Sequence, residues 1–317
     1  MSNKKIVVIA LGGNAILKRG EKGTIEEQLV SVETTVRQLV QMVLSGKYKI
    51  VITHGNGPQV GNLLLQNEIA KDEITPMPLY VCGAQTQGMI GYMIQQSLGN
   101  VLTEHGRGDI PIAAIVTQVV VDSTDPAFTA PSKPVGPFYS QEEAQRIKEE
   151  KGYHMKEDAR GGWRRIVPSP DPIKIQEQIV IKQLLDARTI VIASGGGGIP
   201  VIDQKGRLAG VDAVIDKDFA AERLAENVEA KILLILTDVD QVKLYYQTPQ
   251  EKALSQITAA EAAKYYTAGH FAPGSMGPKV SAALRFVESG GEKAIITSHH
   301  NAFAALEGRA GTTITKD

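Results

Sequence analysis

The chain of 317 residues contains 43% apolar and 22% charged residues, which is an ordinary globular composition and excludes long-range disorder and fibrous repeats. Its 34 Lys and Arg residues against 35 Asp and Glu residues leave a net charge of −1, so we expect no nucleic acid as the main partner. At roughly 150 residues per domain, this length predicts two domains or one large α/β unit with an insertion.

The single cysteine, Cys82, cannot form an intramolecular disulfide or a cysteine-based zinc site, and we expect it to be a small buried residue. No apolar run approaches the roughly 18 residues that a membrane-spanning helix needs. We therefore expect a cytoplasmic protein without a membrane partner.

Short apolar runs rich in β-branched residues recur along the chain, and most are followed by a glycine-bearing turn and then by helical periodicity. The runs are residues 6–11, 50–53, 190–194, 232–236 and 294–297. They are continuously apolar rather than alternating, which is typical of parallel strands that are covered on both faces. The sequence therefore predicts an α/β fold with an open, mainly parallel central sheet between helices.

The first predicted helix follows the first of these strands. Between Ile25 and Val43, apolar residues recur every three or four positions, which places them on one helical face. Thr24 and Glu27 are spaced as in a capping box at the start, and Gly46 marks the end.

Residues 122–172 interrupt the alternation of strands and helices. They hold seven of the fifteen prolines and the only tryptophan, Trp163, and Ser140 with Glu143 predicts a capped helix that ends near Gly152. A stretch of this length without secondary structure is uncommon in a compact domain. We therefore expect a protruding subdomain inserted into one domain that spans residues 1–317. The alternative is a long decorated loop.

Three turns after predicted strands are rich in glycine. They contain Gly12 and Gly13, Gly55 and Gly57, and a run at residues 195–198. A helix that begins at such a turn points backbone N–H groups at a bound anion, and the missing Cβ lets the anion approach. One such turn is often only a turn, whereas three at the carboxyl edge of a parallel sheet predict a ligand site. None fits the dinucleotide fingerprint or the P-loop.

Three lysines lie in turns rather than on helix faces: Lys133 between prolines, Lys217 between two aspartates, and Lys279 after a glycine-rich segment. Phosphoryl transfer chiefly requires charge neutralisation and alignment, which such lysines supply. Each alone is more often a solvated surface residue. The functional interpretation is that the three lysines form one site. Their spacing in the sequence leaves open whether they lie close together in the fold.

Other polar residues give weaker signals. His54, beside a glycine turn, is compatible with substrate binding or with a local hydrogen bond, and His299 with His300 is typical of a helix start. No cluster has the spacing of a metal site, so we expect no resident metal. Tyr245 and its neighbour Tyr246 could flank an adenine, although a buried tyrosine is the commoner case.

Six motifs, taken together and in order from about residue 5 to the end, resemble the carbamate kinases of the amino-acid-kinase family. They are ALGGNA at 10–15, HGNGPQVG at 54–61, SKPVGP at 132–137, ASGGGGIP at 193–200, IDKD at 215–218 and GSMGPK at 274–279. The resemblance implies the amino-acid-kinase fold and a homodimer. It also implies the reversible reaction of ATP and carbamate to ADP and carbamoyl phosphate with Mg²⁺, often run toward ATP in arginine catabolism.

The sequence departs from the wider family at Ala10, where a lysine commonly precedes the first Gly-Gly. Carbamate kinases supply this charge from the protruding lobe, and the matching residue is Lys133. Closing the lobe would bring Lys133 over the reacting groups and exclude water, so we expect a mobile lid hinged near residues 122 and 172. A fixed lobe with a solvated Lys133 is the alternative.

The resemblance also implies a role for individual residues. Lys133 and Lys217 would neutralise the transferred phosphoryl group, Lys279 would hold nucleotide phosphate, and Asp218 would orient the lysines. The carbamate and phosphoryl pocket would be lined by Gly12, Gly13, Asn14, Gly55, Asn56 and Gly57. The nucleotide side would comprise Gly195, Gly196, Thr237, Asp238, Tyr245, Met276 and Gly277.

No general base is evident, and none is required, because a carbamate oxygen is already anionic. Two other functions remain open. One is a kinase of another small carboxylate, such as an acylamino acid. The other is a catalytically silent nucleotide-binding regulator, which loss of Lys133, Lys217 or Asp218 would indicate; all three are present.

Overall fold

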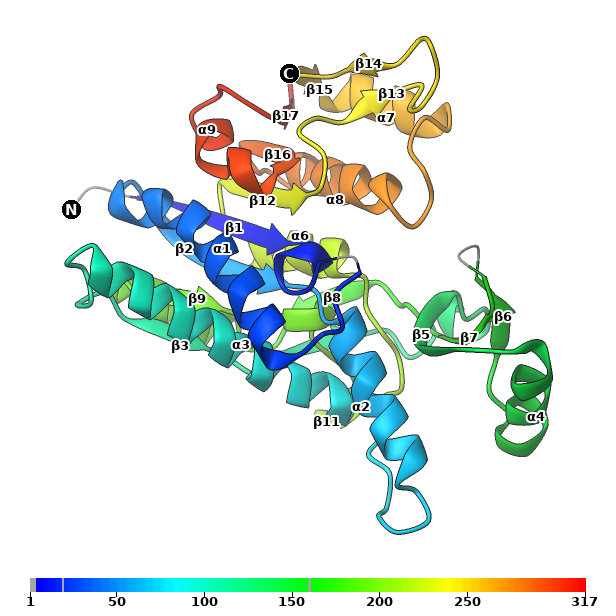
Figure 1. Cartoon of the computed structure of the whole chain (residues 1–317). Helices are drawn as coiled ribbons and strands as arrows, with labels where there is room; N and C mark the ends of the chain where they lie inside the picture. Colours follow the sequence, from blue (N-terminus) through cyan, green and yellow to red (C-terminus); the bar gives the residue numbers. More distant parts are fainter. Residues whose placement is uncertain (1–3, 19, 159–160) are drawn as a thin grey trace.

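A computed structural model describes residues 4–18, 20–158 and 161–317 (Figure 1). Within them the main sheet has eight strands in the order β15-β17-β16-β12-β1-β2-β9-β3. Every neighbouring pair is parallel except β16 and β17. The five apolar runs predicted as strands are β1 (Lys5–Leu11), β2 (Tyr48–His54), β9 (Ile190–Ile192), β12 (Ile232–Thr237) and β16 (Lys293–Ser298). The predicted fold class is confirmed.

Strand β1 shows why these runs are continuously apolar. Successive side chains point to opposite faces, so Val8 and Ala10 pack into one hydrophobic core while Val7, Ile9 and Leu11 pack into the other. Each of these five residues is almost completely buried. The sheet therefore has a core on both faces.

Helices cover both faces. On one side lie α1 (Ile25–Leu44), α3 (Leu79–Glu104) and α9 (Ala302–Leu306), of which α1 and α3 are on the near side in Figure 1. On the other side lie α5 (Gln178–Asp186), α6 (Lys217–Asn227), α7 (Ala259–Thr267) and α8 (Met276–Glu288).

Helix α1 begins and ends as its sequence predicts. Thr24 Oγ1 accepts the N–H of Glu27 at 3.3 Å, and Glu27 Oε2 accepts the N–H of Thr24 at 3.0 Å, which closes the capping box. Gly46 follows the helix with a φ of +64°, a conformation that glycine adopts without steric cost.

The remaining strands of the main sheet are short: β3 (Ile112–Ala114), β15 (Gln256–Thr258) and β17 (Thr312–Thr315). A second sheet runs in the order β11 (Arg207–Gly210), β10 (Ile199–Gln204), β4 (Gln118–Val121) and β8 (Pro172–Ile175). Strands β13 (Lys243–Leu244) and β14 (Lys252–Ala253) form a small hairpin. No helix in the described parts of the chain is long and apolar enough to cross a membrane.

A third sheet stands to one side of the body (Figure 1). It consists of the antiparallel strands β5 (Lys133–Tyr139), β7 (Trp163–Val167) and β6 (Met155–Glu157), joined by helix α4 (Gln141–Lys151). We call residues 133–167 the lobe; residues 159 and 160 lie outside the described part. Helix α4 has the expected capping box between Ser140 and Glu143, and Gly152 ends it in a left-handed conformation.

The lobe is shorter than the expected insertion at residues 122–172, because both ends of that stretch belong to the body. Pro172 begins β8, which pairs with β4 in the second sheet. The backbone N–H of Asp171 donates to Asp125 Oδ2 at 2.9 Å, so the two connections are tied to each other. The two connections of the lobe are therefore hydrogen-bonded to each other beside the second sheet.

Candidate active site

The carboxyl ends of four neighbouring strands carry the candidate residues. Leu11 of β1 pairs with His54 of β2, and Thr237 of β12 pairs with Ser298 of β16. The residues that follow these strand ends are Gly12, Gly55, Asp238 and His299. All four turns therefore lie at the same edge of the sheet, where open α/β sheets bind ligands.

The three lysines singled out in the sequence converge on two aspartates at the start of α6. Lys217 Nζ lies 2.6 Å from Asp218 Oδ1, and Lys279 Nζ lies 3.1 Å from Asp218 Oδ2. Lys133 Nζ, from the first residue of the lobe, lies 2.6 Å from Asp216 Oδ2. Asp216 was not among the predicted site residues, although an aspartate just before a helix is a typical N-cap.

Burial and charge oppose each other at this cluster. The side chain of Asp218 is only 4% exposed, which alone would raise its pKa, but the charges of Lys217 and Lys279 outweigh burial and lower it. The pKa of Lys279 is also lowered, first by burial and then by repulsion from Lys217. Three cations against two carboxylates leave a net positive site that suits an anionic group.

The first two glycine turns adjoin the lysines. A Cβ on Gly55 would lie 3.5 Å from Lys217 Cδ and 3.9 Å from the backbone nitrogen of Gly13. Helix α2 (Gly57–Ile69) starts at this turn with Asn56 as its N-cap residue, and Asn56 Nδ2 donates to Thr86 Oγ1 at 2.8 Å. The structure thus brings the turns at 12–14 and 55–57 together beside Lys217.

The third glycine turn, at residues 195–198, packs against the second, at residues 55–57. A Cβ on Gly195 would come within 2.3 Å of His54 Nε2, and one on Gly196 within 2.2 Å of Asn56 Nδ2. A side chain at either position would displace the turn at 55–57. Gly195 and Gly196 follow β9, which β1 and β2 separate from β12, so they lie away from Thr237 and Asp238. Their predicted nucleotide contacts remain a prediction.

The other predicted nucleotide residues end β12, follow it, or begin α8. Asp238 Oδ2 accepts a hydrogen bond from Asn14 Nδ2 at 2.6 Å, which joins the ends of β12 and β1. Met276 and Gly277 are the first residues of α8, one turn before Lys279. Tyr245 is 50% exposed and stacks edge-to-face on His270, with ring centroids 4.6 Å apart. Tyr246 is 54% exposed, so the alternative interpretation of Tyr245 and Tyr246 as buried tyrosines is wrong.

A buried histidine, His54, and a partly buried one, His299, flank the site. His54 has its pKa lowered to about 4 by burial, and its Nδ1 lies 3.0 Å from the carbonyl oxygen of Gly55, as in the local hydrogen-bond interpretation. Burial also lowers the pKa of His299 to about 4, although Asp238 opposes this shift. Both ring nitrogens of His299 lack a partner among the described residues, and a Cβ on Gly12 would be 3.7 Å from its Nε2. The sequence predicts only a helix start at His299, and a short 3-10 helix does begin there.

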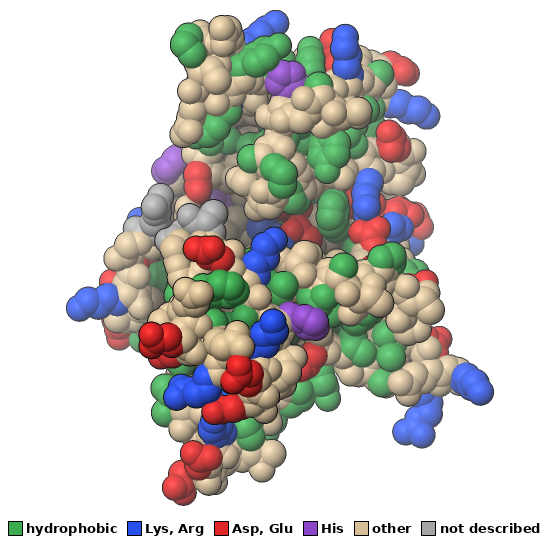
Figure 2. All heavy atoms as spheres, turned by 90° about the vertical axis from the view of Figure 1, so that its right-hand side faces the viewer, with side chains coloured by type: hydrophobic (Ala, Val, Ile, Leu, Met, Phe, Trp, Pro, Cys, Tyr) green, Lys and Arg blue, Asp and Glu red, His purple; other side chains and the backbone are tan. Residues whose placement is uncertain are grey.

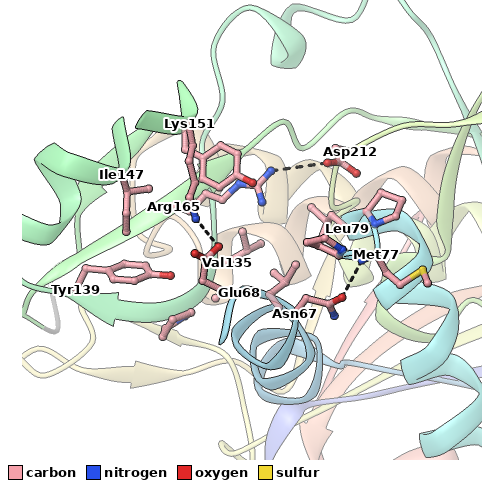
Figure 3. A pocket seen from close by; sticks show the side chains of 16 residues that line it. Asn67, Glu68, Met77, Leu79, Val135, Tyr139, Ile147, Lys151, Arg165 and Asp212 are labelled. Carbon is pink, nitrogen blue, oxygen red and sulfur yellow. Dashed lines mark hydrogen bonds and ion pairs between the residues drawn. The ribbon is translucent and has the colours of Figure 1, made fainter. Parts of the chain in front are cut away.

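The lobe contacts the body through further ion pairs beside a pocket (Figure 3). Lys151 of the lobe pairs with Glu68 of α2, and Arg165 Nη2 lies 3.8 Å from Asp212 Oδ2. The Arg165 guanidinium also lies 3.9 Å from the centroid of the Tyr153 ring. On the side from which the lobe projects, basic and acidic side chains are intermixed (Figure 2).

The described residues contain no group of three or more His, Cys, Asp and Glu side chains that could hold a metal ion. Cys82 is buried and free, as the sequence predicted. The groups at the strand ends include lysine ammoniums, carboxylates and backbone N–H groups.

Comparison with known proteins gives a consistent result. The amino acid kinase family matches residues 5–298. The chain is 55% identical over 315 residues to a carbamate kinase of Thermococcus kodakarensis, covering 99% of this chain and 100% of that protein. It is 53% identical to a carbamate kinase of Pyrococcus furiosus, over 98% and 99% of the two chains. The solved structure of a carbamate kinase from Giardia lamblia bound to AMP-PNP is 46% identical, covers both chains completely and superposes with a TM-score of 0.94.

Proposed function

Because this chain belongs to the amino acid kinase family, among its carbamate kinases, we propose that it transfers a phosphoryl group between carbamoyl phosphate and ADP, giving carbamate and ATP. The observation that carries this proposal is the convergence of Lys133, Lys217 and Lys279 on Asp216 and Asp218 beside two glycine turns. Such a cluster provides the charge neutralisation that phosphoryl transfer requires.

Lys133 and Lys217 neutralise the transferred phosphoryl group in this account. Their Nζ atoms are held by different carboxylates, Asp216 and Asp218, so the two charges approach from separate elements. Fixed charges that need no reorganisation when the reaction occurs are the most effective form of electrostatic stabilisation. Asp218 orients Lys217 without meeting the substrate.

Carbamate and the phosphoryl group occupy the side formed by the turns after β1 and β2. The backbone N–H groups of Gly12, Gly13, Gly55 and Gly57, with the side chains of Asn14 and Asn56, line this pocket. The close approach of the two turns to Lys217 supports this assignment. No proton has to be removed from carbamate, so the reaction requires no general base.

The nucleotide occupies the side formed by β12 and α8, with Lys279 holding its phosphate. Thr237, Asp238, Tyr245, Met276 and Gly277 contribute to this side, and the exposed ring of Tyr245 is available to contact a base. The relative from Giardia lamblia is bound to AMP-PNP, an analogue of ATP, which supports nucleotide use by this chain. Gly195 and Gly196, which were predicted to bind the nucleotide, pack against the turn at 55–57.

Mg²⁺ fits this site as a companion of the nucleotide. Mg²⁺ keeps several waters and is commonly bound by substrate phosphates with only one or two carboxylates, and Asp238 is an exposed carboxylate on the nucleotide side. When bound, Mg²⁺ would offset charge on the nucleotide phosphates. The described residues form no separate metal cage.

The lobe acts as a lid. Lys133 is its first residue and reaches the cluster through Asp216, so movement of the lobe moves one of the reacting charges. Closing it over the substrates would exclude water, from which carbamoyl phosphate must be protected.

We also propose that the protein is a cytoplasmic homodimer that works toward ATP in arginine catabolism. Met89 and Tyr92 of α3 are exposed and three residues apart, so they share a helix face that a second copy could cover. Sedimentation of the purified chain tests the assembly. Tyr92→Glu should shift the dimer toward the monomer. A wild-type protein that sediments as a monomer, like the variant, would contradict the proposed dimer.

Assays with two alternative substrates test the reaction itself. The purified chain with ADP should form ATP from carbamoyl phosphate. With ATP it should not phosphorylate an acylamino acid such as N-acetylglutamate. Phosphorylation of the acylamino acid would favour a kinase of another small carboxylate, and nucleotide binding without either reaction would favour a silent regulator.

A further inference from the structure

Asp216 connects the lobe to the helix that carries two other site residues. Its Oδ1 accepts the backbone N–H of Asp218 at 2.9 Å, which caps the N-terminus of α6. Its Oδ2 accepts a hydrogen bond from Lys133 Nζ at 2.6 Å. Both carboxylate oxygens are therefore used, one on each side of the junction between lobe and body.

The carboxylate of this ion pair is less exposed than the carboxylates of the two other ion pairs described between lobe and body. The Asp216 side chain is 16% exposed, whereas Asp212, which pairs with Arg165 of the lobe, is 44% exposed. A carboxylate that is largely removed from solvent is less screened, so it attracts a neighbouring ammonium more strongly. Among the described residues, Asp216 is also the hydrogen-bond and ion-pair partner of Lys133 Nζ, so it is the contact that can determine where the lobe places this ammonium.

We infer that Asp216 is a positioning residue that holds the Lys133 ammonium in register with Lys217 and Asp218, an inference that rests on the proposed function. A lysine ammonium has three N–H donors. One remains on Asp216 Oδ2 while the others turn to the phosphoryl group. Asp216 also caps the start of α6, the helix that begins with Lys217. The same carboxylate therefore positions both the ammonium of the lobe and the helix that carries Lys217.

A purely structural role as a helix cap predicts a different result, and one substitution separates the two. Asp216→Asn keeps one side-chain oxygen for the Asp218 N–H and replaces the oxygen that faces Lys133 with an amide NH2 donor, which cannot accept from the ammonium. The cap is therefore retained while the ion pair is lost. Asp212→Asn is the matched control, since it makes the same chemical change at another ion pair between lobe and body (Figure 3).

A double-mutant cycle with Lys133→Ala measures whether Asp216 acts through Lys133. Asp216→Asn should lower kcat about tenfold, with the KM for ADP within about twofold of wild type, because Lys133 meets the transferring group and not the nucleotide. In the Lys133→Ala background the same change should cost less than about twofold. An unchanged kcat for Asp216→Asn, or an equal loss in both backgrounds, would overturn the inference.

Chemical labelling provides a readout that does not require activity. In the ligand-free full chain, an amine-reactive ester should acylate Lys133 several-fold faster in Asp216→Asn than in wild type, whereas Asp212→Asn should leave the rate unchanged. Mass spectrometry of the digested protein measures this rate at Lys133. A labelling rate that Asp216→Asn does not change would overturn the inference, even if the wild-type protein formed no ATP and the proposed function had failed.

Discussion

Lys217 and Lys279 bind opposite oxygens of one carboxylate, that of Asp218, at 2.6 and 3.1 Å. Lys217 is adjacent to Asp218 in the chain. Lys279 is 61 residues further on, in the first turn of helix α8. One buried aspartate therefore sets the separation between the charge assigned to the phosphoryl group and the charge assigned to the nucleotide.

Asp218→Asn should lower the turnover of ATP formation by about two orders of magnitude, because both lysines lose the charge that orients them. Removing one partner of a buried charge cluster also leaves uncompensated cations, so the variant should unfold at a lower temperature. Steady-state kinetics and thermal unfolding measure the two effects. Asp186→Asn removes an exposed partner of Lys49 and should change neither.

Lys217→Ala should leave the fold intact and lower turnover by about two or more orders of magnitude, as when one preorganised charge is removed from a reacting site. The control is Lys182→Ala, which removes a surface pair with Glu229 and should retain wild-type turnover. Near-normal turnover by Lys217→Ala would refute its assignment to the phosphoryl group.

Lys133→Ala should slow phosphoryl transfer while the affinity for ADP stays nearly unchanged. Lys148→Ala, an exposed lysine of α4, should have no effect on either quantity. If the lobe closes as a lid, hydrogen exchange across residues 133–167 should slow when both substrates are bound. Equal exchange with and without ligands, together with full turnover by Lys133→Ala, would exclude the lid.

Glu222 gives the protein a predicted dependence of stability on pH. This side chain of α6 is buried, Oε2 has no hydrogen-bond partner among the described residues, and burial raises its pKa to about 7. The folded state therefore favours the protonated form. Its contribution is complete below the unfolded pKa near 4.5 and is lost as the pH rises toward 7.

Glu222→Gln keeps the neutral form at every pH. It should raise the unfolding temperature by a few degrees at pH 8 and by much less at pH 4.5. Comparing thermal unfolding of the two proteins across this range isolates Glu222 from other titrating groups. An equal difference at both pH values would show that Glu222 does not titrate between them.

The sequence predicted the parts of this fold that depend on local pattern. Continuous apolar runs identified the five central strands, and the pairs Thr24 with Glu27 and Ser140 with Glu143 identified two helix starts, because both signals lie within a few residues. The short strands β3, β15 and β17 were missed. Each has only three or four residues, too few to show a period.

The arrangement of the candidate site required the tertiary structure. Lys133 and Asp216 are 83 residues apart, and nothing in their spacing shows that they meet. The role of Gly195 as a packing position against His54 was likewise hidden, because the same glycine run is typical of an anion-binding turn. Asp216 could have been found as a helix N-cap, but its bond to Lys133 could not.

The most direct test of the account is ATP formation by the purified protein from carbamoyl phosphate and ADP, measured beside Lys217→Ala. We predict rapid ATP formation by the wild-type protein and a loss of about two or more orders of magnitude in the variant, with ADP still bound by both. A wild-type protein that binds ADP but forms no ATP, or a variant that forms it at the wild-type rate, would contradict the claim that this lysine cluster transfers the phosphoryl group.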